Sequence, residues 1–397
     1  MTPDAAVAGT TGPVVGVVGG GQLARMLAEA ATPMGVHLWV LAAPSDEGAA
    51  EVVPDVVVGR ADDPAAVRSL AASVDVVTFD HENVDHGVLE ELEAAGVAVR
   101  PSLRTLRFSD KAHQRREFAA AGLPVPDFVV LDGTDPAADA DAAGAFAERH
   151  GGRVVVKASR GGYDGRGVWM LDAASVGGFV TGWSGAPLVL EPRLDLLGEV
   201  AVLAARRPSG EVATWPVLET VQVDGMCDEV VLPAPVDASV ADRAAEVGAQ
   251  VAEVTGAVGV LAVELFVVAG ATGPEVLVNE IAPRVHNSGH LTIEGCATSQ
   301  FEQHLRAVLD WPLGPTHPTA PVAVMVNVVG GDAGDPRDRQ AAALANVPEA
   351  HLHLYGKTSR PGRKIGHVTV LGAERGAVRA RAREAADLLA GVGGSTP

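Results

Sequence analysis

Residues 279–290 carry the side chains with the greatest capacity for chemistry in this sequence. They follow an apolar run, Val276-Leu277-Val278, that is typical of a buried strand, and seven of these twelve side chains are polar. A buried charge or amide without a partner loses much of its solvation energy, so such a stretch is costly inside a core. A polar loop explains any one of these residues, but not a carboxylate, an amide, a guanidinium and two imidazoles together. The combination indicates a site for a metal ion and phosphate.

Two carboxylates stand in neighbouring apolar strands that we expect at 258–268 and 276–280. If the strands pair, Glu264, Glu280 and the amide of Asn279 reach one point. Hard oxygen ligands with open positions suit Mg²⁺ that holds nucleotide phosphates. Paired carboxylates also serve as a glycosidase acid and base, but nothing in the sequence indicates a sugar cleft. Two outward-facing edge glutamates are a weaker interpretation, because the flanking residues are so apolar.

Donor groups follow this carboxylate pair along the chain. Arg284, His286 and Asn287 offer a guanidinium, an imidazole and an amide, which together suit an oxyanion or an acyl phosphate. We expect His290 to be structural. Residues 357–364 gather four basic side chains in eight positions. In a chain of net charge −20 this cluster is better explained as a site for a small anionic ligand than as a solvated turn.

Two glycine-rich segments follow apolar strands. Gly161-Gly162-Tyr163-Asp164-Gly165-Arg166-Gly167 lies between strands that end at Lys157 and begin at Val168, so it predicts a hairpin that closes over a triphosphate and excludes water. An ordinary surface hairpin is the alternative. Lys157 beside this hairpin is predicted to contact phosphate rather than to be an edge charge. Gly19-Gly20-Gly21 resembles a dinucleotide fingerprint but lacks its acidic partner, which favours a tight turn or a substrate-phosphate contact.

The composition bounds the class of protein. The chain has 397 residues, of which 47% are hydrophobic and 20% charged, so it predicts two or three globular domains. A net charge of −20 argues against a nucleic-acid surface. Two cysteines fit a reducing compartment and give no disulfide framework. We find neither a signal peptide nor a membrane span, and we expect a soluble, cytoplasmic protein.

The order of elements predicts the architecture. Strands at 14–18, 36–41 and 74–79 alternate with helices, which predicts a doubly wound parallel sheet in a first domain, residues 1–101. Four strand-like runs in the next domain, residues 102–314, predict a second, mixed sheet. These runs are Val154–Lys157, Val168–Met170, Leu188–Glu191 and Val200–Leu203. A helix is expected at 238–256. Strand-rich segments in residues 315–397 predict a smaller, β-rich third domain.

The chain resembles ATP-grasp ligases in its glycine hairpin, strand lysine, paired glutamates and Asn-Glu step. Four longer strings make the resemblance more specific, and they run from roughly residue 14 to residue 370. They are 21–26 (GQLARM), 161–167 (GGYDGRG), 279–290 (NEIAPRVHNSGH) and 360–367 (RPGRKIGH). Together they resemble the carboxyaminoimidazole ribonucleotide synthetase family of purine biosynthesis.

This resemblance implies an ADP-forming ligation with ATP and Mg²⁺. ATP would phosphorylate bicarbonate to carboxyphosphate, which carboxylates the exocyclic amine of aminoimidazole ribonucleotide. The residues implied at the nucleotide and metal are Lys111, Lys157, Gly162, Tyr163, Asp164, Gly165, Arg166, Gly167, Glu191, Leu194, Glu199, Gln222, Asn279 and Glu280, with Glu264 and Glu280 as metal ligands. Those implied around carboxyphosphate are Arg284, His286, Asn287 and Lys357. Those implied at the ribonucleotide are Gln22, Glu82, Tyr163, Asp164, Arg166, Lys357 and Arg360.

The family's catalytic base and partners are implied in the same way. Asp164 would orient or deprotonate the attacking amine. A homodimer and functional coupling to a downstream mutase are also implied. The sequence departs from the family pattern at Lys111, where an arginine also occurs, at Gln222, where relatives carry histidine, and at Asp80 and His81. Alternatives are a formate-dependent glycinamide ribonucleotide transformylase, a biotin carboxylase subunit or a non-catalytic nucleotide-binding relative.

Overall fold

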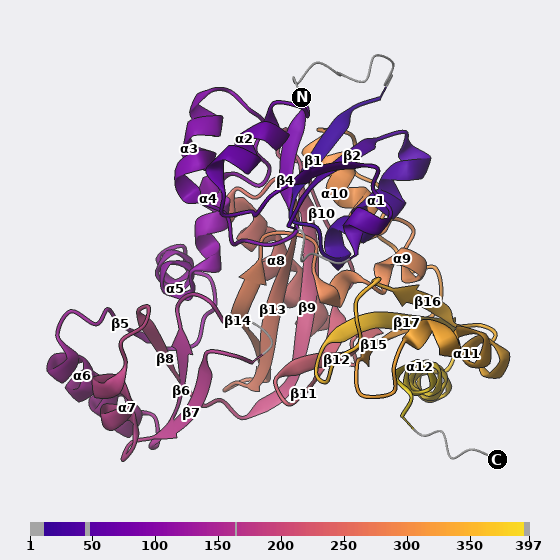
Figure 1. Cartoon of the computed structure of the whole chain (residues 1–397). Helices are drawn as coiled ribbons and strands as arrows, with labels where there is room; N and C mark the ends of the chain where they lie inside the picture. The colour runs from indigo at the N-terminus through magenta and orange to yellow at the C-terminus, as the bar shows by residue number, and fades with distance from the viewer. Residues whose placement is uncertain (1–11, 44–47, 163–164, 393–397) are drawn as a thin grey trace.

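The first domain is built on the expected parallel sheet. The computed structural model describes residues 12–43, 48–162 and 165–392, so Tyr163 and Asp164 lie outside the described residues. The four parallel strands lie in the order β3-β2-β1-β4 (Figure 1). Their bounds are β1 Val14–Val18, β2 His37–Ala42, β3 Asp55–Val58 and β4 Val76–Phe79.

Helices cover both faces of this sheet, as a doubly wound domain requires. Helix α1 (Gln22–Met34) packs with Val15 and Val17 of β1. Val18 points to the other face, where α2 (Pro64–Ala71) and α3 (His86–Ala94) pack. Successive residues of a strand face opposite sides of a sheet, which explains how one short strand serves two cores.

A small lobe carries the glycine hairpin. Its four antiparallel strands have the order β5-β8-β6-β7, and α6 and α7 pack against them at one side of the molecule (Figure 1). The predicted hairpin is present, because β6 and β7 pair with Lys157 opposite Val168. The bounds are β5 Val129–Leu131, β6 Arg153–Ala158, β7 Val168–Asp172, β8 Leu188–Pro192, α6 Pro136–Arg149 and α7 Val176–Gly182.

The expected mixed sheet of the middle domain is wrong. Strand β9 (Leu196–Arg206) pairs with β13 (Gly259–Ala269) in a nine-stranded sheet, separately from β6, β7 and β8. Every strand pair found in these two sheets is antiparallel. Sequence runs of Val and Leu predict strands well, but do not identify their partners. The predicted helix is α8 (Ala238–Thr255).

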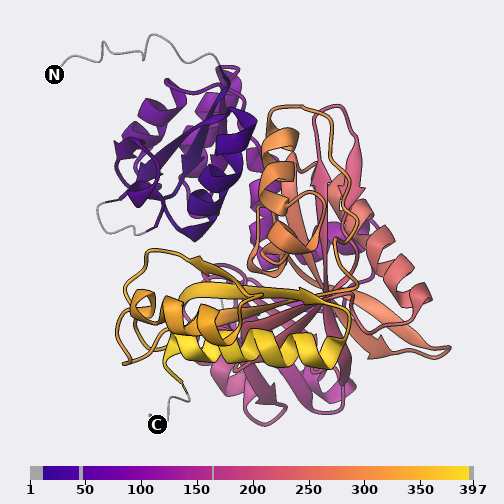
Figure 2. The ribbon, with the colours of Figure 1, turned by 90° about the vertical axis from the view of Figure 1, so that its right-hand side faces the viewer.

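The strand-rich C-terminal segment continues the same sheet. Strand β12 (Met226–Leu232) pairs with β15 (Val322–Val329), and β17 (Lys364–Gly372) and β16 (His351–Leu354) follow, so the order is β14-β13-β9-β11-β12-β15-β17-β16. Helices α11 (Gln340–Asn346) and α12 (Arg375–Ala390) pack beneath this end (Figure 2). The domain boundaries near residues 101 and 314 remain predictions.

The remaining elements complete the chain. They are β10 Val212–Thr214, β11 Leu218–Val223, β14 Pro274–Ala282, α4 Leu103–Leu106, α5 Lys111–Ala120, α9 Thr292–Gly295, α10 Gln300–Val308 and the short 3₁₀ turns η1 Ala49–Glu51, η2 Arg107–Ser109, η3 Asn287–Gly289 and η4 Pro336–Arg339. No helix in the described part of the chain combines the length and the apolar character needed to cross a membrane. Cys227 and Cys296 are buried free thiols.

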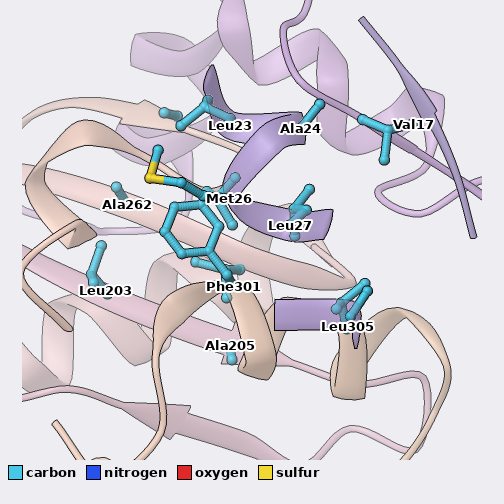
Figure 3. Close-up of a cluster of buried hydrophobic side chains, with 14 of the residues drawn as sticks. Val17, Leu23, Ala24, Met26, Leu27, Leu203, Ala205, Ala262, Phe301 and Leu305 are labelled. Carbon is cyan, nitrogen blue, oxygen red and sulfur yellow. The ribbon is translucent and has the colours of Figure 1, made fainter. Parts of the chain in front are cut away.

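An apolar core joins the first domain to the large sheet. Leu23 and Met26 of α1 lie beside Phe301 of α10 and beside Leu203 and Ala262 of the sheet (Figure 3). These side chains are almost completely buried. Close-packed interiors leave little room for movement between the parts that share them. This core therefore fixes the first domain against the face of the sheet that carries Glu264.

His304 of α10 makes this interface sensitive to acid. Its Nε2 lies 2.8 Å from Thr78 Oγ1 of the first domain, and its Nδ1 accepts the Val260 N–H at 3.0 Å. Burial lowers the pKa of His304 to about 4. Above the ordinary value of 6.5 the ring is neutral both folded and unfolded. As the pH falls from 6.5 towards 4, only the unfolded chain gains the proton, so stability is lost in that window.

We expect His304→Gln to reduce the acid dependence of stability. The substitution removes a contribution of up to about 3 kcal/mol to the loss of stability between pH 6.5 and 4. Urea unfolding of both proteins at a series of pH values measures it. The difference in unfolding free energy between wild type and variant should shrink as the pH falls. A difference that is constant from pH 7 to pH 4 would contradict the assignment.

Candidate functional site

The two predicted metal ligands lie directly opposite each other. Glu264 of β13 pairs with Glu280 of β14 in the antiparallel register, and Leu265 pairs with Val278. Asn279 is therefore the extra residue of a β-bulge. A bulge re-aims side chains and is often found beside active sites. This one brings the amide of Asn279 next to the opposed carboxyl groups of Glu264 and Glu280.

The two carboxyl groups differ in their protonation. Burial, together with the charges of Glu280 and Glu199, raises the pKa of Glu264 to about 8. Burial also opposes ionisation of Glu280, but the Lys111 ammonium outweighs it and holds the pKa of Glu280 at about 2. Lys111 begins α5 and is ion-paired with Glu280. The pair therefore shares a single proton near neutral pH, as closely spaced carboxyls do.

Lys157 reaches this point from the small lobe. Its ammonium lies 2.8 Å from Glu191 Oε2 and donates to Asn279 Oδ1 at 2.9 Å. It also lies 5.7 Å from the centre of the Phe266 ring. Burial lowers the pKa of Lys157, although Glu191 counteracts part of that effect. A buried lysine with two oxygen partners is held as an oriented cation, which suits contact with phosphate.

Arg115 completes this arrangement, and the sequence analysis missed it. Its Nε lies 2.5 Å from Glu191 Oε1, and its terminal nitrogen donates to the Asn279 carbonyl at 2.5 Å. The side chain is 2% exposed. The available signal was the position of Arg115 on the buried face of α5, with Ala112 and Phe118, because a charge there requires a partner.

The first domain contributes two residues, Glu82 and Gln22, to the candidate site. Arg284 Nε lies 2.9 Å from Glu82 Oε1, so a loop after β4 meets the loop after β14. Burial opposes ionisation of Glu82, but Arg284 outweighs it and lowers the pKa. Gln22, the first residue of α1, accepts a hydrogen bond from the Lys357 ammonium. Both predicted first-domain residues therefore lie against predicted residues of the later domains.

His286 faces the carboxylate pair as a neutral ring. Its Nε2 lies 3.6 Å from Glu264 Oε1, and its Nδ1 accepts from the Ser288 N–H at 3.3 Å. Burial, followed by the charges of Arg284 and Lys364, lowers the pKa of His286 to about 4. This hydrogen-bond network assigns the ring proton to Nε2, so the imidazole can donate a hydrogen bond without being charged.

Asn287 exchanges hydrogen bonds with Asn327 of β15. The two amides donate to each other's oxygens at 2.9 and 2.8 Å, and Asn327 also donates to the Cys227 carbonyl at 2.9 Å. Asn327 was another residue that sequence reasoning missed. The signal was an amide inside the otherwise apolar strand β15, since such an amide must find hydrogen-bond partners.

The Gly19-Gly20-Gly21 turn has an internal anion. The N–H of Gly21, at the start of α1, donates to the Asp80 carboxylate. Burial raises the pKa of Asp80, against the opposing effects of His81 and Gly21. A carboxylate at a helix N-terminus takes the place that a phosphate occupies in dinucleotide-binding proteins. This observation favours the structural-turn interpretation of the glycines.

A cleft of about 490 Å³ lies beside Lys357, between the first and C-terminal domains. It is lined by Glu51, Gly334, Asp335, Arg337, Gly356, Lys357, Thr358 and Ser359. Arg360 lies exposed nearby in the same segment. Arg337 in this lining is ion-paired with Asp335, so Lys357 and the hydroxyl groups of Thr358 and Ser359 are the donors of the cleft best suited to a phosphorylated polar ligand.

The glycine hairpin approaches the β11–β12 turn. A Cβ built on Gly165 would lie 3.2 Å from the Gly225 Cα, so side chains are excluded there. Gly162 packs against the carbonyl of Arg166 across the hairpin, and Gly165 and Gly167 both have left-handed φ angles. Gln222 lies half-buried in β11 near this turn.

Glu199 and Leu194 lie at the edge of the site. Burial raises the pKa of Glu199, and Lys157 and Glu280 are the nearest charges acting on it. Leu194 is half-buried in the segment that joins β8 to β9. The described residues thus bring the predicted metal, lysine and donor groups together, with Gln222, Leu194 and Arg360 on the periphery.

The donor set fits Mg²⁺. A carboxyl group whose pKa is about 8 in a protein interior lacks counter-charge, and a divalent cation between Glu264 and Glu280 would supply it. Among the described residues, no three His, Cys, Asp or Glu side chains form a self-contained metal site. Mg²⁺ is commonly held by one or two carboxylates with waters and substrate phosphates in the other positions, which matches this set.

The fold and this site define the chain as an ATP-grasp ligase, an enzyme that couples ADP formation to bond formation. Family models match over almost the whole chain: a ribonucleotide synthetase preATP-grasp domain at 13–110, an ATP-grasp domain at 116–301 and a phosphoribosylaminoimidazole carboxylase C-terminal domain at 323–381. The chain belongs to the N5-carboxyaminoimidazole ribonucleotide synthase family.

Curated relatives and solved structures agree with this assignment. The Mycobacterium bovis N5-carboxyaminoimidazole ribonucleotide synthase is 47% identical over 392 residues, covering 97% of this chain and 89% of the relative. The Corynebacterium ammoniagenes enzyme is 46% identical, covering 95% and 92%. The Aspergillus clavatus enzyme complexed with ATP superposes with a TM-score of 0.86 at 31% identity, covering 97% of this chain and 100% of that one. Its complex with ADP and 5-aminoimidazole ribonucleotide gives 0.85 at 32% identity, with the same coverage.

We expect Arg115→Met to destabilise the protein strongly. Removal of one partner from a buried ion network typically costs about 3–5 kcal/mol, because the remaining charge is left uncompensated. Arg116→Met is the matched control, since Arg116 is exposed on the same helix and surface substitutions change stability by roughly 0.5 kcal/mol or less. Urea unfolding at pH 7 compares the two. Equal unfolding free energies for both variants would show that Arg115 does not sustain the network.

Proposed function

We propose that this chain carboxylates the exocyclic amine of 5-aminoimidazole ribonucleotide with bicarbonate, in an ATP-dependent reaction of purine biosynthesis. The products are N5-carboxyaminoimidazole ribonucleotide, ADP and phosphate. The observation that carries the proposal is near-full-length similarity to synthases of this name, among them a structure complexed with ADP and the ribonucleotide. The paired glutamates and two lysines at one point supply the groups that ATP-dependent ligation requires.

The nucleotide half of the site uses residues of helix α5, of both antiparallel sheets and of the segment that joins β8 to β9. Lys111 and Lys157 bind ATP phosphates, and the glycine hairpin covers them. Glu191, Leu194, Glu199 and Gln222 surround the adenosine part. Glu264 and Glu280 would hold Mg²⁺, with Asn279 beside them, and the bound ion would neutralise charge on the phosphates. The ion pair of Lys111 with Glu280 and that of Lys157 with Glu191 keep both ammonium groups within reach of this region.

The acyl-phosphate half of the site consists of donors. Arg284, His286, Asn287 and Lys357 surround carboxyphosphate in our proposal. Arg284 is oriented by Glu82 and Asn287 by Asn327, so neither group has to reorganise when negative charge develops. Neutral His286 donates from Nε2. Carboxyphosphate is short-lived in water, and a closed hairpin over a donor-lined pocket slows its hydrolysis.

The ribonucleotide lies, in this proposal, between the first domain and residues 357–360. Gln22, Glu82, Lys357 and Arg360 contact it, together with Tyr163, Asp164 and Arg166 of the hairpin. Asp164 orients or deprotonates the amine. The contact between Gln22 and Lys357 and the adjoining cleft of about 490 Å³ support this placement. A homodimer, coupling to a downstream mutase and a cytoplasmic location complete the proposal, on the strength of the family resemblance.

The defining experiment measures ADP release with each substrate in turn. We expect full activity only when MgATP, bicarbonate and 5-aminoimidazole ribonucleotide are all present, with one carboxylated product formed per ADP. Product is identified by ¹³C-bicarbonate labelling and mass spectrometry. Ligation with formate and glycinamide ribonucleotide would instead favour a transformylase, and binding of ATP without any turnover would favour a non-catalytic relative.

We expect Glu264→Gln to separate activity from stability. Because the pKa of Glu264 is about 8, its carboxyl is already neutral at pH 7 without metal, and the isosteric amide should leave the unfolding free energy within about 1 kcal/mol of wild type. The activity should fall by about 10²- to 10³-fold, as when one preorganised charge-stabilising group is lost. The Mg²⁺ concentration for half-maximal activity should rise.

Glu275→Gln is the matched control for the metal site, because Glu275 is an exposed carboxylate on β14. It should retain wild-type activity and Mg²⁺ dependence. Unchanged activity in Glu264→Gln, or an equal loss in both variants, would remove Glu264 from the metal site.

A further inference from the structure

Gln300 holds the main chain of His286 on both sides. It is the first residue of α10 and is fully buried. Its Oε1 accepts the His286 N–H at 2.9 Å, and its Nε2 donates to the His286 carbonyl at 2.7 Å. A side-chain amide thereby pairs with a loop residue in the way that a neighbouring strand would. His286 is outside the strand ladder, since β14 ends at Ala282.

The orientation of the Gln300 amide follows from these two bonds. Because Nε2 must face a carbonyl and Oε1 must face an N–H, the amide cannot be reversed. The same Nε2 lies 3.1 Å from His290 Nδ1, which therefore accepts a hydrogen bond. Gln300 is itself anchored, because its own N–H donates to Thr292 Oγ1 at 2.8 Å. Four hydrogen bonds thus hold Gln300, two to the His286 backbone, one to His290 and one to Thr292.

The two hydrogen bonds from the Gln300 amide to the His286 backbone determine where the His286 ring projects. The backbone of His286 is fixed by Gln300, and the ring is fixed by Ser288 at Nδ1, so Nε2 is directed towards Glu264. Close packing preserves this geometry: a Cβ built on Gly289 would overlap Gln300 Oε1. With Gln300 shortened or apolar, the part-buried N–H and carbonyl of His286 would lose these partners, and a shift of the loop would be needed to replace them.

The same network extends towards Lys357. The His290 ring lies 5.0 Å from the His367 ring, centre to centre, and His367 Nδ1 lies 2.8 Å from the Tyr355 hydroxyl. Lys357 lies over the Tyr355 ring at 5.7 Å. Hydrogen bonds and ring contacts together therefore link Gln300 to Tyr355, the residue beneath Lys357.

We propose that Gln300 is a positioning residue for ligation, which sets the His286 imidazole against the acyl phosphate through both hydrogen-bonding groups of the His286 backbone. The inference rests on the proposed function. Gln300 lies behind the loop and acts through His286. Its effect falls on the step in which carboxyphosphate is formed and kept from water, because a displacement of about 1 Å at a reacting group can cost about 10²-fold in rate.

The chain supplies a matched control in Gln303. Gln303 is fully buried three residues further along α10, and its amide makes the same reciprocal pair with a backbone, donating to the Gly314 carbonyl at 2.8 Å and accepting the Gly314 N–H at 2.7 Å. A Cβ built on Gly314 would meet Thr298 and Arg306, neither of which is assigned to the site. Methionine is similar in size to glutamine and flexible, so Gln300→Met and Gln303→Met delete equivalent hydrogen bonds at similar packing cost.

The experiment compares thermal unfolding and steady-state turnover of the two variants with wild type. We expect similar decreases in melting temperature for both. Gln300→Met should lower kcat for carboxylation by about 10- to 100-fold. Its KM for ATP should change by less than about threefold, and it should release more than one ADP per carboxylated product. Gln303→Met should keep wild-type kcat and a one-to-one ratio. Equal kcat and equal stoichiometry in the two variants would overturn the positioning role.

A second variant covers the case in which Gln300→Met does not fold. Gln300→Glu retains an oxygen for the His286 N–H but places a second oxygen against the His286 carbonyl. We expect it to show the same lowered kcat and excess ADP release, whereas full coupling in this variant would overturn the proposal. Wild type lacking bicarbonate- and ribonucleotide-dependent turnover would instead refute the proposed function.

Discussion

The register between β13 and β14 is the constraint on which the rest of the site depends. It sets Glu264 across from Glu280 and expels Asn279 as a bulge, so two buried carboxyls and an amide converge. Two carboxylates so close and so buried cannot both ionise without cations. Lys111 supplies one positive charge, and burial beside Glu280 still raises the pKa of Glu264 to about 8. The strand pairing therefore creates the carboxyl pair to which we assign Mg²⁺ in the proposed function.

The other elements serve to bring cations to this point from separate directions. Lys111 begins α5, whose Arg115 fixes Glu191 on β8, and Glu191 in turn orients Lys157 on β6. The small lobe has an apolar core of its own. The ion pairs of Glu191 therefore contribute to holding this lobe beside α5 and the large sheet. The first domain is joined differently, by the apolar core around Met26 and Phe301 (Figure 3). Apolar packing fixes the first domain against the large sheet, and ion pairs position the lysines that we assign to ATP.

Local sequence patterns predicted the fold elements and many of the residues that converge, but not the partners of those residues. The parallel sheet, the glycine hairpin and the β13–β14 pair follow from periodicity and turn residues, which act over short distances. Whether Val200–Leu203 pairs with β8 or β13 depends on tertiary packing, and the mixed sheet was wrong for that reason. Arg115, Asn327 and Gln300 escaped notice because each satisfies a partner far away in sequence. Their common signal is a polar side chain in an otherwise buried element.

The stretch 279–290 shows why such distant partners are needed. Its first part belongs to β14, where ladder hydrogen bonds fix Asn279 and Glu280 to the sheet. Beyond Ala282 the ladder ends, and Arg284, His286 and Asn287 are held instead by Glu82, Gln300 and Asn327 from three other parts of the chain. Outside a strand ladder, backbone and side-chain groups of a loop are held in one position only when other side chains supply their hydrogen bonds. The donors on this loop are therefore preorganised mainly by partners distant in sequence, to which Ser288 adds a local contact with the His286 ring.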